Sequence, residues 1–430
     1  MLRLKLAAFL AIICTNVIAT TFQPSGVPFR NPVVTAPGLT ASVVFSNLTA
    51  PRGITFDSEG NLLVVERGFG VTALSAVTGG FERTVVIEST AFTQGIQVDG
   101  TDLYVSTAGE VLLYQYNPAT KSVTAGIPQS VITGVPADGE LTTHALLLEK
   151  DGEDETIGIL VGSGPLTNID PTARDPASGR SQVRRFVLPA TGGQSSWSSG
   201  QVVAYGIRNP GGFAFSPSGS KLYIVENGAS IDNVTGLTEA FVNDNPADEL
   251  NVIDWPPAPN STPKFFGFPD CTTLWNPEAD PTGVPDYLGL DRGDQISLKL
   301  IPQRDDAWCA DEENNARPNV VFQAHSVPLD IKFYEGPQTS TPASLPSAFI
   351  GDPFVSFRGS FDRDPPTGYG VVRVKSSLPN GYEFIVQTAD LSLCPGSCIR
   401  PVGLAFAEDG TLFVSSDASQ EVFVVEKQSS

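Results

Sequence analysis

Two polar side chains stand at the start of a β-hairpin, where the hairpin itself does not need them. Residues 205–228 read YGIRNPGGFAFSPSGSKLYIVENG, with strand-like runs FAF and KLYIV on either side of the turn SPSGS. Arg208 and Asn209 precede the first run. A guanidinium and an amide can donate several hydrogen bonds to one ligand, and the guanidinium fork matches a carboxylate. These residues therefore indicate a binding site for an anionic ligand.

The same arrangement recurs along the chain, in the order polar residue, nearby glycine, strand, turn, strand. Clear copies begin at Arg52 (RGITFDSEGNLLVVERG), Gln94 (QGIQVDGTDLYVST), Arg208 and Arg400 (RPVGLAFAEDGTLFVSSD). Looser copies cover residues 143–188 and 325–374. About six such units, at uneven spacings with insertions, predict an all-β protein that folds as a six-bladed β-propeller. The segment SVVFSNL near residue 45 could complete the last blade.

The propeller geometry predicts where the repeated polar residues lie. The first strand of each blade lines the central channel, so the residue before it lies at the channel mouth. We therefore expect six side chains to converge on one face: Arg52, Gln94, His144, Arg208, His325 and Arg400. One arginine alone would more simply bond to a loop carbonyl. Three arginines at equivalent points of a repeat favour a shared anionic ligand.

The N-terminus is typical of an exported protein. Residues 1–19 predict a signal peptide, with a basic start at Arg3 and Lys5 and a short apolar core, although a membrane anchor is the alternative. Residues 20–430 are then expected to form a single propeller domain. Three N-glycosylation sequons fit an extracellular protein, at Asn47, Asn233 and Asn260. We expect a monomer that does not bind membranes.

The cysteines agree with secretion. Removal of the signal peptide leaves four of them, Cys271, Cys309, Cys394 and Cys398. An even number in an exported chain indicates disulfides. Cys394 and Cys398 in CPGSC are close enough for a local bridge, which would pair Cys271 with Cys309. Other pairings remain open, and a zinc site would want histidine or further cysteine nearby.

The net charge of −21 argues against a nucleic-acid partner, because like charges repel. We interpret the charge as an aid to solubility. The alternative is an acidic face for a basic partner.

In several motifs the chain resembles the glucose/sorbosone dehydrogenases, quinoproteins built on a six-bladed propeller, and especially their secreted fungal pyranose dehydrogenase branch. The resemblance covers nearly the whole mature chain. It is carried by the order of the motifs PRGITFDSEGNLLVVERG, YGIRNPGGFAF, VENG, NPADELN, FGFPDC, RGSFDRDPPTGYGVVRV and IRPVGLAFAEDGTLFVSSD.

The resemblance implies pyrroloquinoline quinone (PQQ) on the propeller axis, together with calcium. The cofactor carries three carboxylates, which suit several arginines. The cofactor-binding residues implied by the matching motifs are Arg52, Arg208, Asn209, Arg358 and Arg400. Calcium would be held largely by backbone oxygens near Asn227, Gly228 and Ala229.

His144 lies where the family has its catalytic base. Its implied role is to take the proton of a sugar's anomeric C1 hydroxyl while hydride passes to the quinone, which would yield a lactone. His325 is the only other histidine and is expected to line the mouth. Electrons would pass to an external acceptor, such as a haem protein, a copper oxidase or a small quinone.

The sequence departs from the family pattern at three points: Gln94 replaces a histidine, Ala145 follows His144 where an arginine is common, and Arg358 replaces the histidine of an HGSWNR motif. The first two could loosen cofactor binding or alter substrate choice. Two other functions therefore stay open. One is a cofactor-free propeller that binds carbohydrate or protein, and the other is a calcium-dependent lactonase, which would need carboxylates at the blade entrances.

Overall fold

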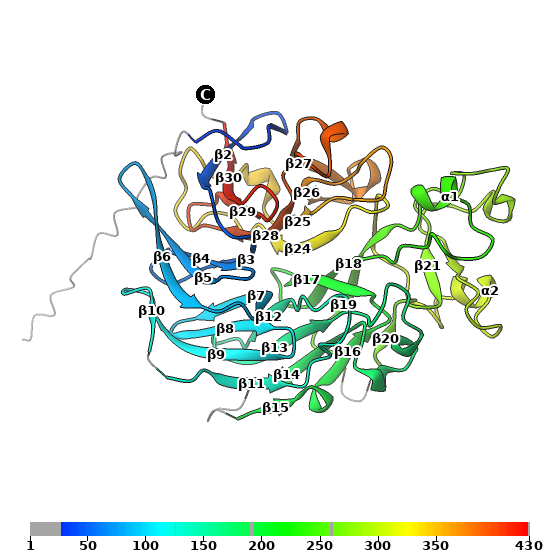
Figure 1. The fold of residues 1–430 in the computed structure, drawn as a ribbon, viewed down its shortest axis with the longest axis horizontal. Helices are drawn as coiled ribbons and strands as arrows, with labels where there is room; N and C mark the ends of the chain where they lie inside the picture. The colour runs from blue at the N-terminus through cyan, green and yellow to red at the C-terminus, as the bar shows by residue number, and fades with distance from the viewer. Residues whose placement is uncertain (1–26, 125, 189–192, 259–260, 429–430) are drawn as a thin grey trace, which may run out of the picture.

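The computed structural model describes residues 27–124, 126–188, 193–258 and 261–428. The predicted signal peptide (residues 1–19) and the sequon at Asn260 lie outside the described residues, so both stay predictions. Within these residues the chain forms six sheets of four or more strands and one two-stranded sheet. Figure 1 shows the large sheets arranged around a common centre. The predicted all-β, six-bladed propeller is confirmed.

The first three blades follow the chain from residue 51. Written from the innermost strand outward, the first blade is β3 (Pro51–Phe56), β4 (Leu62–Glu66), β5 (Gly70–Val77) and β6 (Gly80–Glu88). The second is β7 (Phe92–Asp99), β8 (Asp102–Thr107), β9 (Glu110–Asn117), β11 (Gln129–Thr133) and β15 (Ser195–Ser196), with β10 (Ser122–Val123) beside β9. The third is β12 (Leu146–Lys150), β13 (Thr156–Ser163), β14 (Gln182–Val187), β16 (Gln201–Tyr205) and β20 (Lys264–Phe265).

The other three blades include both ends of the described chain. The fourth blade is β17 (Asn209–Phe215), β18 (Lys221–Asn227), β19 (Asp248–Asp254) and β23 (Val320–Phe322). The fifth is β24 (Pro328–Phe333), β25 (Pro353–Phe357), β26 (Gly370–Val374), β27 (Tyr382–Thr388) and β1 (Val33–Thr35). The sixth is β28 (Pro401–Phe406), β29 (Leu412–Ser416), β30 (Glu421–Lys427) and β2 (Leu39–Phe45). As predicted, a strand from the N-terminal part completes the last blade, because β2 pairs antiparallel with β30.

The glycines of the repeat allow the innermost strands to approach one another closely. A Cβ atom on Gly53 would lie 2.2 Å from the carbonyl oxygen of Gln94, and one on Gly95 would lie 2.4 Å from that of His144. A Cβ on Gly403 would lie 2.5 Å from the carbonyl oxygen of Arg52. Only glycine fits at these contacts, which explains why a glycine follows the polar residue in the repeat.

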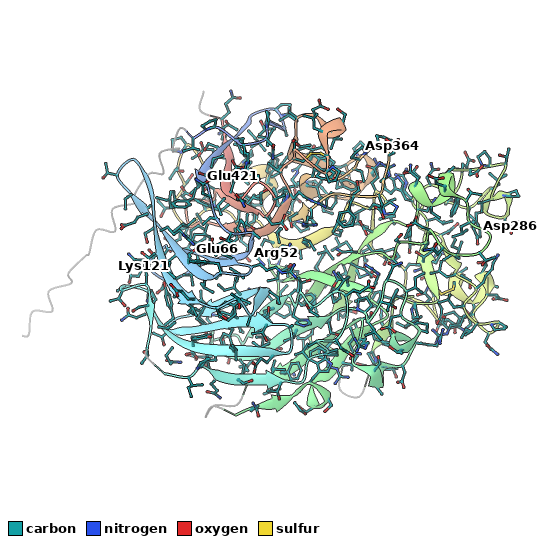
Figure 2. The ribbon with its side chains drawn as sticks, in the orientation of Figure 1. Arg52, Glu66, Lys121, Asp286, Asp364 and Glu421 are labelled. Carbon is teal, nitrogen blue, oxygen red and sulfur yellow. A yellow bond between two sulfur atoms is a disulfide. The ribbon has the colours of Figure 1, made fainter. Side chains whose placement is uncertain are left out.

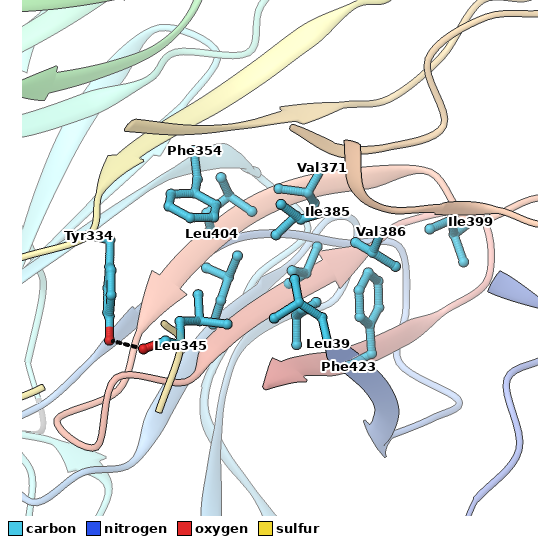
Figure 3. Close-up of a cluster of buried hydrophobic side chains, with 13 residues drawn as sticks. Leu39, Tyr334, Leu345, Phe354, Val371, Ile385, Val386, Ile399, Leu404 and Phe423 are labelled. Atoms are coloured by element: carbon cyan, nitrogen blue, oxygen red, sulfur yellow. Dashed lines mark hydrogen bonds between the residues drawn. The ribbon is translucent and has the colours of Figure 1, made fainter. Parts of the chain in front are cut away.

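Apolar side chains fill the spaces between blades. Figure 3 shows one such cluster, in which Phe354, Leu404 and Phe423 pack between the fifth and sixth blades. Tyr334 belongs to the same cluster and donates its hydroxyl hydrogen to the backbone oxygen of Leu345 at 3.0 Å. The cores between the blades fix the sheets and hence the loops at their ends.

An insertion lies to one side of the ring (Figure 1). It contains α1 (Glu239–Asn243), the two-stranded sheet of β21 (Cys271–Thr273) and β22 (Gln295–Ser297), and α2 (Asp306–Ala310). The predicted disulfides are both formed, Cys271–Cys309 in this insertion and Cys394–Cys398 before the last blade. None of the helices in the described ranges is long and apolar enough to cross a membrane.

We expect Gly53→Ala to lower the free energy of unfolding by about 2 kcal/mol or more, because the new methyl group overpacks the contact between β3 and β7. Urea unfolding followed by intrinsic fluorescence measures the change. Gly152→Ala is the control, since an added Cβ there meets no atom within 4 Å. Equal stability of the two variants would contradict the close-approach explanation.

Candidate functional site

Loops from several blades surround a cavity of about 360 Å³. The charged residues and histidine of its wall are Arg52, Arg67, Arg208, Arg358, Glu140, Asp248, Asp362 and His325. Four arginines thus face three carboxylates, in a chain whose net charge is −21. Figure 2 places Arg52 near the centre of the ring. The wall therefore gathers positive charge in an otherwise acidic protein, which suits an anionic ligand.

Arg52 is fixed by side chains from two other blades. It is 5% exposed, and its Nη1 donates to Asp417 Oδ2 at 2.7 Å while its Nη2 donates to Gln94 Oε1 at 2.6 Å. Burial lowers the pKa of Arg52 to about 10, so the guanidinium stays charged at neutral pH. Its Nε is buried and has no partner in the protein. A ligand oxygen could accept that hydrogen bond.

Asp417 also holds Arg358. The Nε of Arg358 donates to the same carboxylate oxygen, Asp417 Oδ2, at 2.8 Å. One buried carboxylate therefore fixes two of the arginines that line the cavity. Sequence reasoning missed Asp417. The available signal was its repeat position, since VVERG, IVENG and VSSDA all place a polar residue at the end of a blade's second strand.

Arg208 and Asn209 lie on the opposite part of the wall. Arg208 donates from Nε to the backbone oxygen of Asn168 and from Nη2 to Asn168 Oδ1, both at 3.0 Å. Burial lowers the pKa of Arg208. Asn209 donates to Asn227 Oδ1 at 2.8 Å, and its own Oδ1 is buried without a partner. Asn209 can therefore accept a hydrogen bond from a ligand.

The three predicted metal ligands, Asn227, Gly228 and Ala229, all line the cavity. Asp248 lies beside them and accepts from the backbone N–H of Gly228 at 2.8 Å and from that of Val327 at 2.7 Å. Among the described residues no group of three or more His, Cys, Asp or Glu is arranged to hold a metal ion. A cation here would therefore depend on backbone oxygens and on few carboxylates, as calcium sites can.

Three buried carboxylates lie in or next to this part of the wall. Glu226, Asp248 and Glu249 are each less than 10% exposed. Burial raises the pKa of all three, to about 6 for Asp248 and about 7 for Glu249. Part of their charge is met by hydrogen bonds, because the amide of Asn251 donates to both glutamates at 3.2 Å.

His144 does not reach the cavity. It is 1% exposed, with Nδ1 2.8 Å from the carbonyl oxygen of Gly162 and Nε2 2.8 Å from that of Ala108. Burial lowers the pKa of His144. Both ring nitrogens thus face backbone oxygens, and the residue is not part of the cavity wall. This placement suits a structural histidine.

His325 is the histidine that lines the cavity. Its Nε2 lies 2.9 Å from the carbonyl oxygen of Val242, and its Nδ1 lies 3.6 Å from Asp362 Oδ1. The backbone here is strained, since φ is 61° at His325 and 57° at the β-branched Val327. Such outliers cost on the order of 1–3 kcal/mol and cluster at functional sites. Residues 325–327 are therefore a candidate functional segment.

Arg400 does not line the cavity. Its Nε donates to the backbone oxygen of Arg358 at 3.1 Å, and its Nη2 donates to that of Gly359 at 2.7 Å. Its guanidinium carbon lies 5.1 Å from the ring centroid of Phe361 and 5.6 Å from that of Tyr369. Burial lowers the pKa of Arg400 to about 10. Arg400 therefore supports the loop that carries Arg358 and Phe361.

Three of the six repeat residues thus line the cavity, Arg52, Arg208 and His325. Gln94 lies in the channel below, where it bonds to Arg52 and donates to the carbonyl oxygen of Gly211 at 3.1 Å. His144 and Arg400 do not line the cavity. Equivalent positions in the repeat therefore did not give equivalent side-chain directions.

Comparisons with known proteins agree with the fold. A family model described as TrAA12-like matches residues 33–428. The chain belongs to this family. It is 33% identical to a pyrroloquinoline quinone-dependent sugar dehydrogenase of Hypocrea jecorina (strain QM6a), over 99% of this chain and 96% of the relative. It is 32% identical to a pyrroloquinoline quinone-dependent pyranose dehydrogenase of Coprinopsis cinerea, over 92% of this chain but only 54% of that relative's length.

Solved structures of the TrAA12-like family's relatives are similar throughout. The calcium structure of the Trichoderma reesei Carbohydrate-Active Enzymes Family AA12 protein has a TM-score of 0.81 and 31% identity, covering 95% of this chain and 100% of that one. The holo form of the pyranose dehydrogenase PQQ domain from Coprinopsis cinerea has a TM-score of 0.79 and 29% identity, covering 94% and 99%.

We expect Asp417→Asn to lower the free energy of unfolding by about 2–3 kcal/mol, because it removes the charge that pairs with the buried Arg52 and the partly buried Arg358. Chemical unfolding at pH 7 measures the loss. Asp254→Asn is the matched control, since Asp254 pairs with Lys221 on the surface, where its side chain is 87% exposed, and should show no measurable change. An Asp417→Asn protein as stable as the control would contradict the role given to Asp417.

We expect Glu249→Gln to flatten the dependence of stability on pH. The folded state raises the pKa of Glu249 from 4.5 to about 7. The folded state therefore favours the protonated carboxyl of Glu249. Its contribution to the free energy of unfolding is fully present below the unfolded pKa and is lost as the pH rises through the folded pKa. The variant should gain about 1–3 kcal/mol over the parent at pH 8 and little at pH 5, measured by urea unfolding in calcium-free buffer. The lowered pKa of His144 also makes stability depend on pH, but this contribution is the same in the variant and the parent and cancels in their difference. Parallel pH profiles would contradict the prediction.

Proposed function

We propose that the protein is a secreted, PQQ-dependent dehydrogenase that oxidises the anomeric C1 hydroxyl of pyranose sugars, aldoses or osones, to lactones. The cavity wall carries the proposal: four arginines gather there, and two buried polar atoms, Arg52 Nε and Asn209 Oδ1, have no partner in the protein. Family membership and the activities for which the relatives are named support the same activity.

The donors of the wall fit the proposed cofactor. PQQ carries three carboxylates, and Arg52, Arg208 and Arg358 place three guanidiniums around one cavity. Asn209 adds a buried acceptor. Arg400, which the sequence assigned to the cofactor, does not line the cavity and donates to the backbone oxygens of Arg358 and Gly359, so we give it a supporting role. When bound, the quinone supplies a two-electron acceptor for hydride from the sugar.

Calcium is the proposed metal. Asn227, Gly228 and Ala229 would hold it, and the Asp248 carboxylate beside them would supply negative charge. The buried carboxylates below favour a cation at this point and disfavour an anion. The wall around Arg52 and Arg358 has the opposite preference. Arg52 and Arg358 thus suit the cofactor's carboxylates, while Arg208 lies beside the proposed metal ligands, with its Nη1 3.5 Å from the backbone oxygen of Asn227.

The proton acceptor is proposed from the same geometry. His325 lines the cavity, and if its Nε2–H donates to the carbonyl oxygen of Val242, its Nδ1 is free to take a proton. Asp362, 3.6 Å from Nδ1, would stabilise the resulting positive charge. The sequence assigned this role to His144, which is buried away from the cavity. We therefore favour His325 as the base, with His144 as the competing hypothesis.

Electrons would leave to an external acceptor, for which a haem protein, a copper oxidase or a small quinone remain the candidates. We further propose an extracellular monomer with glycans at Asn47 and Asn233, both of which are exposed. Digestion with a glycosidase and mass measurement would test the glycans.

Reconstitution tests the proposed function. The unloaded protein is titrated with PQQ by calorimetry in calcium and in chelator, and dye reduction is then followed with a panel of aldoses and osones. We expect calcium-dependent binding and sugar-dependent dye reduction. Arg208→Ala should weaken PQQ binding at least about tenfold, because it removes a charge-assisted contact. Arg317→Ala, a surface arginine paired with Asp294, is the control.

Two results would contradict the proposal. Folded, calcium-replete protein that does not bind PQQ would favour a cofactor-free binding propeller. Calcium-dependent lactone hydrolysis without PQQ would favour the lactonase alternative.

The identity of the base is tested by two variants. We expect His325→Ala to lower kcat at least about a hundredfold, the usual scale of general-base catalysis, while PQQ still binds. His144→Gln should lower thermal stability and leave kcat of the folded protein within about threefold, since it contacts only backbone. The reverse pattern would return the base to His144.

A further inference from the structure

One aromatic ring stands exposed between two cavities. Phe361 lines the cavity described above and also a second cavity of about 390 Å³. It is 64% exposed, which is unusual for a phenylalanine. The second cavity lies between residues 360–369 and the turn that follows η7 (Leu391–Leu393). A ring in this position can contact a ligand that extends from one cavity into the other.

The ring of Phe361 is supported from one side. The guanidinium of Arg400 lies over it, 5.1 Å from its centroid, and is itself fixed by bonds to the carbonyl oxygens of Arg358 and Gly359. A cation packed on one face of an aromatic ring stabilises its orientation. The exposed fraction shows that much of the rest of the ring remains available to a ligand.

The walls of the second cavity are held in place on both sides. On one side the backbone N–H of Ser360 donates to the carbonyl oxygen of Thr367 at 3.1 Å, which closes the loop. On the other side the Cys394–Cys398 disulfide closes the turn. Prolines form much of the lining, namely Pro365, Pro366 and Pro395. Such a surface loses little conformational entropy when a ligand binds.

The chemistry of this cavity suits a sugar ring. A pyranose has apolar C–H faces and a rim of hydroxyl groups. Phe361 and the prolines offer flat apolar surface, while Asp364 and Ser392 are exposed polar groups at the edge. Arg363 is less available, because it bonds to the carbonyl oxygens of Asn243 and Pro365 and to Asp244. Apolar platforms with a few polar groups at the rim are what small-ligand sites provide.

We propose that the second cavity is a subsite for a second sugar unit, so that the substrate class is a reducing disaccharide or longer oligosaccharide. This inference rests on the proposed function. The first cavity, of about 360 Å³, must hold both the cofactor and the reacting ring. The next sugar unit must therefore lie outside it. Phe361 lines both this cavity and the second one, which has a similar volume.

Kinetics with matched sugars test the subsite. The probes are glucose and the disaccharides cellobiose, maltose and lactose. We expect at least one disaccharide to have a lower KM than glucose. Phe361→Ala should raise the disaccharide KM about tenfold and the glucose KM less than about threefold. The reason is that only a disaccharide has a second sugar ring, which would lose its stacking contact with Phe361. Val187→Ala is the control, an apolar residue of equal exposure, 63%, on β14.

A second variant fills the cavity and leaves Phe361 unsubstituted. Ser392 is exposed and lines the second cavity, so Ser392→Trp should block it and raise the disaccharide KM alone. Binding is measured independently of turnover by saturation-transfer NMR with the alditols of the three disaccharides, which have no free anomeric hydroxyl to oxidise. We expect saturable binding of at least one alditol to the parent protein and loss of that binding in Ser392→Trp.

The outcomes separate the subsite from the proposed function. If no sugar is oxidised but Ser392→Trp still abolishes alditol binding, the dehydrogenase proposal fails and the subsite stands. If glucose is oxidised but no disaccharide is preferred and no alditol binding depends on Ser392, the subsite is overturned. Equal increases of both KM values in Phe361→Ala, with Ser392→Trp silent, would likewise overturn it.

Discussion

The pairing of β2 with β30 is the constraint on which the site depends. It joins a strand near the N-terminus to the last blade and closes the ring. Arg52 in the first blade and Asp417 in the last are separated by 365 positions, yet their side chains lie 2.7 Å apart. Closure also brings Gly403 against Arg52. Without it the central strands would not surround a common axis, and the cationic wall would not form.

The cavity concentrates costs that the rest of the fold must offset. Arg52 and Asn209 each leave a buried polar atom without a partner, and residues 325–327 hold two positive φ angles. Three carboxylates are buried under the same wall. Each feature costs on the order of 1–3 kcal/mol in a folded protein without ligand. The apolar clusters between the six blades supply the opposing stabilisation. Strain and unsatisfied groups thus gather where a ligand would relieve them.

Much of the fold followed from local sequence. The repeat of strand, turn and strand predicted six blades, and the turns fit because Gly60 and Gly219 adopt positive φ angles there. The completing strand near residue 45 and both disulfides were also predicted correctly. These features depend on local backbone chemistry or on the closure that every propeller needs, which a sequence displays directly.

The site was less predictable because repeat position fixes a residue's backbone place and leaves its side-chain direction open. His144 and Arg400 occupy positions equivalent to those of Arg52 and Arg208, but neither of them lines the cavity. Neighbouring blades decide the difference. Arg52 meets Asp417 and Gln94, two partners that hold it toward the axis, whereas Arg400 meets the carbonyl oxygens of its neighbouring loop.

The partners of the site residues also come from segments that the repeat does not describe. Asn168, which fixes Arg208, lies in the connection between β13 and β14, and Val242, which faces His325, belongs to α1 in the insertion. Insertions vary in length and carry no periodic pattern, so their contacts become visible only in three dimensions. The propeller therefore supplies the cavity and its cations, while the insertions select which of the repeated polar residues can act there. The same division would let one scaffold accept different sugars by changing loops alone.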